Sequence, residues 1–256
     1  MSWPNEDECV RGVDLSYYQK DLNVADFVAK NSTVERYVLR AVWPNSSPDQ
    51  AFLPLYDALS AKKQGVGAYF WPNPSKTLAQ VETAWKTALA GREPAFVALD
   101  IEWSQVDWKN HGMTPIRSIT DDTRETLRMA DDMFGPEKVI IYAGGYNWAE
   151  LVRQHGWEYQ YKFWIPHYPT WWKAGPASWR QALDFEELEA RLPYSGTYFP
   201  NTGDHIPKAN VVGWQFSDHG RLPGYGNNLD LSLWLKPAGP TLEERVAALE
   251  EMAHSH

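Results

Sequence analysis

The stretch "PAFVALDIEW" (residues 94–103) is an apolar segment that ends in two acidic side chains. An apolar run, Phe96 to Leu99, leads directly into Asp100, Ile101 and Glu102. Side chains alternate across a strand, so residues two apart share a face. The stretch therefore predicts a strand that carries Asp100 and Glu102 side by side at its end. Two like charges in this position need an explanation from the rest of the chain.

Strand-like and helix-like segments alternate along the 256 residues. The expected strands are 10–18, 36–43, 65–71, 94–103, 138–144, 161–168 and 210–216. The expected helices are 49–63, 75–91, 121–134 and 147–156, with Ser75 as the N-cap and Gly91 as the stop of the second. This alternation predicts an α/β fold with a parallel sheet and crossover helices. The length suits a single barrel of about 250 residues.

The repeat becomes irregular after residue 170, where strands are no longer followed by helices. We therefore expect an irregular TIM-like barrel of five βα units and then mostly strands. Seven strands are clear, and the eighth is expected within 177–209, around 196–199.

Both ends of the chain differ from the barrel segment at 10–236. Residues 1–9 form an acidic extension without the apolar core of a signal peptide. Residues 237–256 begin as a linker and continue as a short helix, in which Thr241 and Glu244 form a capping box. This helix either packs on the barrel or forms a short coiled coil that makes a homo-oligomer. No run of 18 apolar residues predicts a membrane span.

Composition excludes several classes of function. The net charge of −9 argues against a nucleic-acid partner, which needs clustered Lys and Arg, and gives no attraction to an anionic membrane. The single cysteine, Cys9, excludes an intramolecular disulfide and a cysteine-based zinc site, and is expected as a partly buried thiol. The 14 Trp and 13 Tyr residues suit a cleft that binds sugars, because a ring packs on a ring face.

The Asp100 and Glu102 pair has three interpretations. The carboxylates form salt bridges or cap a loop, they bind a metal with further oxygen ligands, or they perform acid/base chemistry with different pKa values. The third is favoured because the functional face of an α/β barrel lies at the carboxyl ends of its strands. Asp14 in "GVDLSYYQ" and Asp230 in "GNNLDLSLW" place two more acids near such ends. We expect no metal and no cofactor, and no GxSxG, P-loop, GxGxxG or HExxH pattern occurs.

Aromatic and polar side chains follow the same strand ends. The candidate substrate-binding residues are Tyr69, Trp71, Tyr142, Trp164, His167, Tyr168, Trp214 and Gln215. Each of these taken alone is typical of a protein core or of a structural hydrogen bond. Their recurrence at one end of the barrel predicts a carbohydrate groove.

Six motifs in this order resemble glycoside hydrolase family 25, the muramidase-type lysozymes. They are "RGVDLSYYQ", "GVGAYFW", "VALDIEW", "VIIYAGGYNW", "FWIPHY" and "VVGWQFSDHGRLPGYGNNLDLSLW", and together they span about residues 10–236. The resemblance implies a barrel of five βα units plus three strands. It also implies cleavage of the β-1,4 bond between N-acetylmuramic acid and N-acetylglucosamine in bacterial peptidoglycan.

By this resemblance Glu102 is the general acid and Asp100 its stabilising or orienting partner, with Asp14 and Asp230 as further acids of the site. Residues two apart on a strand have Cα atoms about 6.6–6.8 Å apart, which suits the short carboxyl separation of retaining enzymes. Substrate-assisted chemistry through the N-acetyl group is the alternative. The chain departs from the family at Trp71, Pro166, the loop at 104–120 and the expanded stretch at 170–209.

The resemblance to endolysins predicts a protein that is made in the cytoplasm and reaches the cell wall by release with a phage or by delivery with a virion. Two other functions stay open at this point. One is a non-catalytic, glycan-binding barrel of a virion. The other is a glycosidase for a different N-acetylated polymer such as chitin.

Overall fold

The computed structural model describes residues 8–62, 65–152, 156–169, 171–173, 178–191, 200, 202 and 205–236. The predicted C-terminal helix at 241–256, the linker before it and most of the N-terminal extension lie outside the described residues, as does the stretch 196–199.

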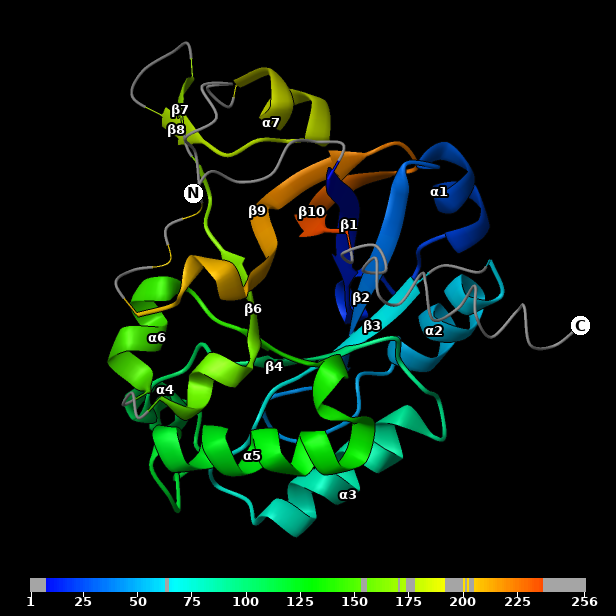
Figure 1. Ribbon diagram of the computed structural model, residues 1–256. Helices are drawn as coiled ribbons and strands as arrows, with labels where there is room; N and C mark the ends of the chain where they lie inside the picture. The colour runs from blue at the N-terminus through cyan, green and yellow to red at the C-terminus, as the bar shows by residue number, and fades with distance from the viewer. Residues whose placement is uncertain are drawn as a thin grey trace, which may run out of the picture.

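Eight strands close into a barrel with the order β1-β10-β9-β6-β5-β4-β3-β2 (Figure 1). They are β1 (Cys9–Leu15), β2 (Val34–Val42), β3 (Gly65–Phe70), β4 (Val97–Asp100), β5 (Val139–Tyr142), β6 (Lys162–Pro166), β9 (Val211–Leu222) and β10 (Tyr225–Leu235). Strands β1 to β6 and β9 pair in parallel, whereas β10 is antiparallel to both β9 and β1. The expected irregular TIM-like barrel is confirmed.

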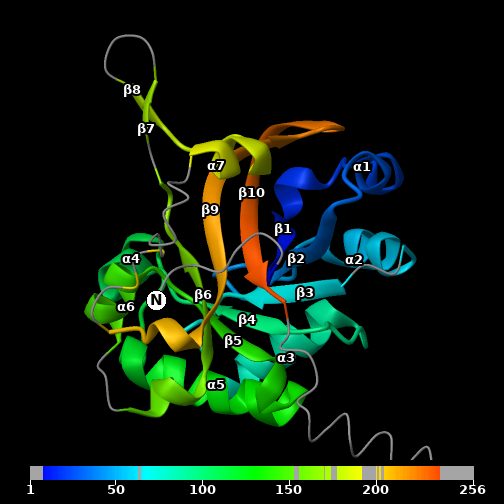
Figure 2. The ribbon, with the colours of Figure 1, turned by 45° about the horizontal axis from the view of Figure 1, so that its top comes forward.

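Helices follow each of the first five strands and lie around the outside of the barrel (Figure 2). They are α1 (Val24–Lys30), α2 (Phe52–Ser60), α3 (Leu78–Leu89), α4 (Gln105–Asn110), α5 (Ile119–Phe134) and α6 (Gly145–Leu151). After β6 come a small hairpin, β7 (Trp171–Lys173) and β8 (Ser178–Arg180), and helix α7 (Phe185–Arg191). The prediction of five βα units followed mostly by strands is therefore confirmed. Within the described residues, no helix combines the length and the apolar character needed to cross a membrane.

The eighth barrel strand is β10, so its expected place within 177–209 was wrong. The strand that precedes it, β9, runs to Leu222, well past the predicted end at residue 216. Pro223 and Gly224 then reverse the chain, and Gly224 has a φ of +88°, which a residue without a Cβ adopts at little cost. This long hairpin returns the chain across the barrel and closes it against β1.

Two local predictions also needed correction. Thr77, not Ser75, caps α3, because its side chain and that of Gln80 form a reciprocal capping box. Residues 105–110, expected as loop, form α4, which has a similar box between Ser104 and Asp107. Gly91 lies just past α3 with a φ of +81°, as predicted for a helix stop.

Large aromatic rings fill the barrel interior, and glycines make room for them. A Cβ on Gly12 would lie 2.5 Å from Trp234 Nε1, and one on Gly67 would lie 2.4 Å from the Phe96 ring. A Cβ on Gly213 would meet both Trp234 and Trp164 at under 3 Å. These rings form a packed cluster in the barrel interior, and the side chains at the mouth of the barrel pack against it. Cys9, at the start of β1, is a free and buried thiol.

Candidate active site

Side chains from most of the barrel strands converge on one cavity of about 170 Å³, here called the carboxyl cavity. Its lining residues are Asp14, Arg40, Tyr69, Trp71, Asp100, Glu102, Tyr142, Trp164, Gln215 and Asp230. Most of these residues lie near or just past the carboxyl ends of the parallel strands, the functional end of an α/β barrel, whereas Gln215 lies within β9, which continues to Leu222. All four predicted acids lie in this one cavity.

The topology explains how distant acids meet. Asp14 and Asp230 are register partners across the antiparallel β1–β10 pair. Asp100 is the last residue of β4, where it pairs with Tyr142 of β5. Glu102 lies two residues past the end of β4, although the sequence predicted one strand to residue 103. The chain still brings the two carboxyl groups together, since they share a side-chain hydrogen bond.

Burial raises the pKa of every acid in the cavity. Asp100 and Asp14 are only 5% and 4% exposed, and burial holds the pKa of each well above the usual range. The charge of Glu102 raises the pKa of Asp100 further, and the charge of Asp230 raises the pKa of Asp14 further. Burial also raises the pKa of Glu102 to about 7 and that of Asp230 to about 7. The cavity therefore holds protons near neutral pH.

Gln215 connects several of these groups. Its Nε2 donates a hydrogen bond of 2.8 Å to Oδ2 of Asp14. Its Oε1 accepts hydrogen bonds from the hydroxyls of Tyr142 at 2.8 Å and Tyr168 at 2.6 Å. One oxygen of Asp14 and one of Asp100, Oδ1 in each case, are buried without a hydrogen-bond partner among the described residues.

Three of the predicted substrate-binding residues lie outside the carboxyl cavity. Tyr168 acts on the cavity through Gln215, while His167 uses its backbone to bond to the same strand, β9. Trp214 is fully buried, and its Nε1 donates to the backbone carbonyl of His167 at 2.7 Å. Side chains alternate along β9, so Gln215 faces the cavity and Trp214 packs in the core beneath the rim. Its assignment to the groove is therefore corrected.

Among the residues that the structure describes, no group of three or more His, Cys, Asp or Glu side chains is arranged to hold a metal ion.

Comparison with solved structures identifies the architecture. A family 25 glycosyl hydrolase from Bacillus anthracis superposes with a TM-score of 0.63 at 16% identity, over 94% of each chain. This protein has the family 25 fold. A bacterial lysozyme from Streptomyces coelicolor gives a TM-score of 0.58 at 17% identity, over 92% of this chain and 94% of that one. The catalytic domain of the endolysin ply40, from bacteriophage P40 of Listeria monocytogenes, gives a TM-score of 0.58 at 17% sequence identity, over 89% of this chain and 94% of that one.

Comparison of sequences alone gives no match for this chain. No family model matches the chain, and no curated protein matches it. The similarity is thus one of fold.

Sequence reasoning missed one member of the cavity, Arg40, which β2 delivers to the same mouth of the family 25 fold. Arg40 Nε donates to Asp49 Oδ2 at 2.8 Å, and the two form a buried ion pair. The guanidinium carbon lies 3.3 Å from the centre of the Trp43 ring. Its charge opposes the rise in pKa at Asp100 and Asp230. A charged residue near the end of the apolar segment at 36–43 was the available signal.

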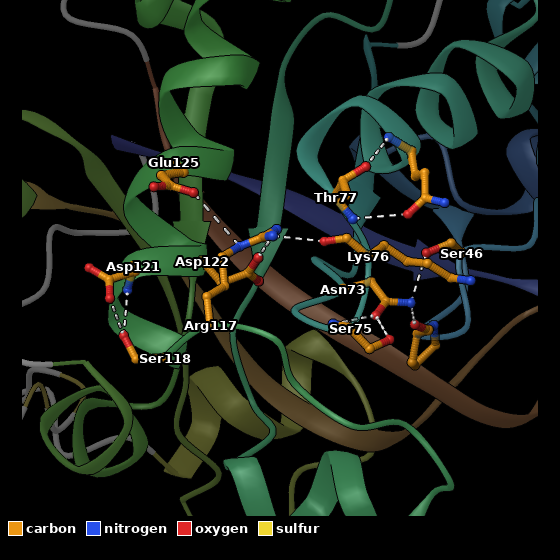
Figure 3. Close-up of polar contacts among 12 residues, drawn as sticks. Ser46, Asn73, Ser75, Lys76, Thr77, Arg117, Ser118, Asp121, Asp122 and Glu125 are labelled. Carbon is orange, nitrogen blue, oxygen red and sulfur yellow. Dashed lines mark hydrogen bonds and ion pairs between the residues drawn. The ribbon is translucent and has the colours of Figure 1, made fainter.

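The hydrogen bonds and ion pairs of Asn73 and Arg117, here called the loop frame, connect the loops around the cavity (Figure 3). Asn73 is fully buried, and its Nδ2 donates to the Pro44 carbonyl and to Ser46 Oγ, both at 2.9 Å. Arg117 donates to the Lys76 carbonyl at 2.7 Å and forms an ion pair with the buried Asp122 of α5. These contacts tie the loops after β2 and β3 to the segment that leads into α5.

Proposed function

We propose that this protein is a muramidase that hydrolyses the β-1,4 bond between N-acetylmuramic acid and N-acetylglucosamine in bacterial peptidoglycan. One observation carries the proposal: two hydrogen-bonded carboxyl groups, Asp100 and Glu102, share a buried cavity with two further acids. Glycoside cleavage needs a protonated carboxyl group and a second group that supports positive charge at the anomeric carbon. The fold shared with lysozymes and endolysins supports the same function.

Glu102 is the proposed general acid. Of the two paired carboxyl groups it is the more exposed, so it is better placed to meet a glycosidic oxygen that enters from solvent. Its pKa of about 7 keeps a substantial fraction protonated near neutral pH. When the bond between the anomeric carbon and the leaving oxygen breaks, the proton of Glu102 passes to that oxygen. Glu102 then accepts a proton from the water that completes the hydrolysis.

Asp100 is the proposed orienting residue. The two carboxyl groups interact directly, and the charge of Glu102 helps to raise the pKa of Asp100. In a retaining glycosidase the acid and the nucleophile are about 5–5.5 Å apart. We take the substrate's own acetamido oxygen as the attacking group, with Asp100 orienting the acetamido N–H. The expectation drawn from strand spacing assumed a strand that continues to Glu102, and β4 ends earlier.

Product analysis tests the bond that is cleaved. Purified peptidoglycan is digested, and the new reducing ends are identified by borohydride reduction and mass spectrometry. Reducing N-acetylmuramic acid supports the muramidase, whereas reducing N-acetylglucosamine contradicts it. A parallel digest of chitin separates the muramidase from a chitin-type glycosidase. Tight binding to peptidoglycan without any new reducing end would favour a non-catalytic glycan-binding barrel.

A further inference from the structure

Two residues of β9, Asp218 and His219, lie opposite a single residue of β10, Asp230. The flanking register pairs are Ser217 with Leu231 and Gly220 with Leu229. Over this interval β9 has one residue more than β10, which makes it a β-bulge. Bulges change the direction of side chains and are common next to active sites. This one places Asp218 and His219 on the strand beside an acid of the carboxyl cavity.

The expanded stretch at 170–209, a departure from the family pattern, holds this bulge in place. Its chain between β8 and α7 lies against β9 (Figure 2). The backbone N–H of Asp218 donates to Gln181 Oε1 at 3.0 Å. The buried Ser217 donates through Oγ to the Ala182 carbonyl at 2.6 Å, and the His219 N–H donates to Ser217 Oγ at 3.2 Å. The bulge is thus fixed from outside the barrel as well as by strand pairing.

The two side chains of the bulge pair with each other at the surface. His219 Nδ1 contacts Asp218 Oδ1, and the two side chains are 59% and 39% exposed. Residues that lie opposite each other on antiparallel strands have Cβ atoms about 4.5–5.5 Å apart. At such a separation the charge of Asp218 acts on the Asp230 carboxyl group.

The charges around Asp230 are consistent with this placement. Burial raises the pKa of Asp230 to about 7, and among the neighbouring charges that of Asp218 raises it most, ahead of Glu102. Arg40 and His219 act in the opposite direction. The charged or titratable groups of the cavity and its rim on other elements are Asp14, Arg40, Tyr69, Asp100, Glu102, Tyr142 and Tyr168.

We propose that Asp218 and His219 are positioning residues that set the charge of Asp230 in opposite directions, and that Gln181 anchors the bulge that holds them there. The inference rests on the proposed function, since Asp230 is one of the acids of the glycan-cleaving site. It gives the expanded stretch a role in that site, because Gln181 belongs to this stretch.

Carbon NMR of the aspartate side chains measures the charge of Asp230 directly. The protein is labelled with ¹³C at the aspartate carboxyl carbon, and the Asp230 signal is assigned through Asp230→Asn. Its apparent titration midpoint is then compared between wild type and variants. We expect Asp218→Asn to lower the midpoint by about 0.5–1 pH unit, the size of a Coulomb interaction across about 6 Å near a protein surface. His219→Gln should raise the midpoint.

The opposite signs separate a charge effect from a general disturbance of the strand, which has no reason to move the two variants in opposite directions. Glu82→Gln is the matched control, because it breaks an exposed ion pair with Lys86 on the outer helix α3. It should leave the midpoint of Asp230 unchanged. An unmoved midpoint in Asp218→Asn, or shifts of the same sign in Asp218→Asn and His219→Gln, would overturn the proposal.

Gln181→Ala tests the anchor. Without the bond from its N–H to Gln181, Asp218 is held less firmly beside Asp230. Asp218→Asn should therefore shift the midpoint by less in the Gln181→Ala background than in wild type. Equal shifts in the two backgrounds would contradict the anchoring role of Gln181.

The titration requires no glycan, so this proposal and the proposed function can fail separately. Opposite shifts of the Asp230 midpoint in a protein that releases no reducing ends would support the positioning residues and remove the muramidase. Cleavage of peptidoglycan together with an unmoved midpoint would remove the positioning residues and leave the muramidase.

Discussion

Gln215 of β9 donates a hydrogen bond of 2.8 Å to Asp14 of β1, although the two residues are 201 positions apart in the chain. The same amide accepts from Tyr142 and Tyr168, so its orientation is fixed. This bond lowers the pKa of Asp14, against the larger effects of burial and of the Asp230 charge. Gln215 is therefore a positioning residue that acts through Asp14.

Replacing Gln215 by methionine removes the amide and keeps a similar volume. We expect kcat to fall between about tenfold and 100-fold, because Asp14 loses the hydrogen bond from the Gln215 amide that holds it in position. The change in KM should be smaller. The pH at which activity changes should also move, since the Asp14 pKa loses the bond that lowers it. Steady-state kinetics across pH measure both effects, with Gln50→Met at an exposed position as the matched control. A loss of kcat with an unmoved pH profile would indicate a structural role alone.

The pH dependence of activity follows from the protonation of Glu102. A general acid works in its protonated form, and the Glu102 pKa is about 7. Activity should therefore fall as pH rises through about 7, approaching a tenfold loss for each further pH unit. Initial rates of glycan cleavage, measured as kcat/KM, check this. A flat profile between pH 6 and 9 would exclude Glu102 as the titrating acid.

Asp230→Asn should make the protein more stable above neutral pH and less active. The folded pKa of Asp230, about 7, lies above the usual value of 3.8, so its stabilising contribution is present at low pH and is lost as pH rises through about 7. An amide removes this penalty, and we expect a gain of about 1 kcal/mol or more at pH 8. Urea unfolding at pH 5 and pH 8 measures the difference. Asp57→Asn is the control, because Arg92 lowers the Asp57 pKa and its loss should give no gain.

Asn73→Ala should destabilise the protein, because the fully buried amide bonds to three partners in the loop frame of Figure 3. Leaving the Pro44 carbonyl without its donor predicts a loss of about 2 kcal/mol in the free energy of unfolding. Thr77→Ala removes only a helix cap and should lose about 1 kcal/mol. Urea unfolding compares the two. A smaller loss in Asn73→Ala than in Thr77→Ala would show that the frame contributes little.

The barrel could be predicted from the sequence because its first six strands are short apolar segments that alternate with helical ones. Periodicity identifies such elements locally. The closing strand was placed wrongly because β9 and β10 form a hairpin with a two-residue turn, and only closure against β1 shows that β10 belongs to the barrel. Helix α4 was missed since six residues are too few for a helical period to appear.

Asp14, Asp100 and Glu102 could be predicted because they lie near or just past the carboxyl ends of β1 and β4. Asp230 was also predicted, but it lies within the antiparallel strand β10, opposite Asp14. Arg40 and the neighbouring hollow of about 420 Å³, whose lining includes Trp43, Trp71, Trp103 and His111, could not be predicted. This hollow combines loops after β2, β3 and β4, and the contacts between Trp71, Trp103 and His111 arise only when these loops fold together. Trp214 shows the opposite error, because a residue next to the cavity-facing Gln215 points into the core.

The central claim is that Glu102 donates the proton that frees the leaving sugar. Its most direct test compares the release of reducing ends from peptidoglycan by wild type, Glu102→Gln and the exposed control Glu35→Gln at pH 6. The account predicts that Glu102→Gln loses between about 10² and 10⁴ in kcat while it keeps its fold and its affinity for the glycan, and that Glu35→Gln is unchanged. Release by Glu102→Gln at the wild-type rate would contradict it.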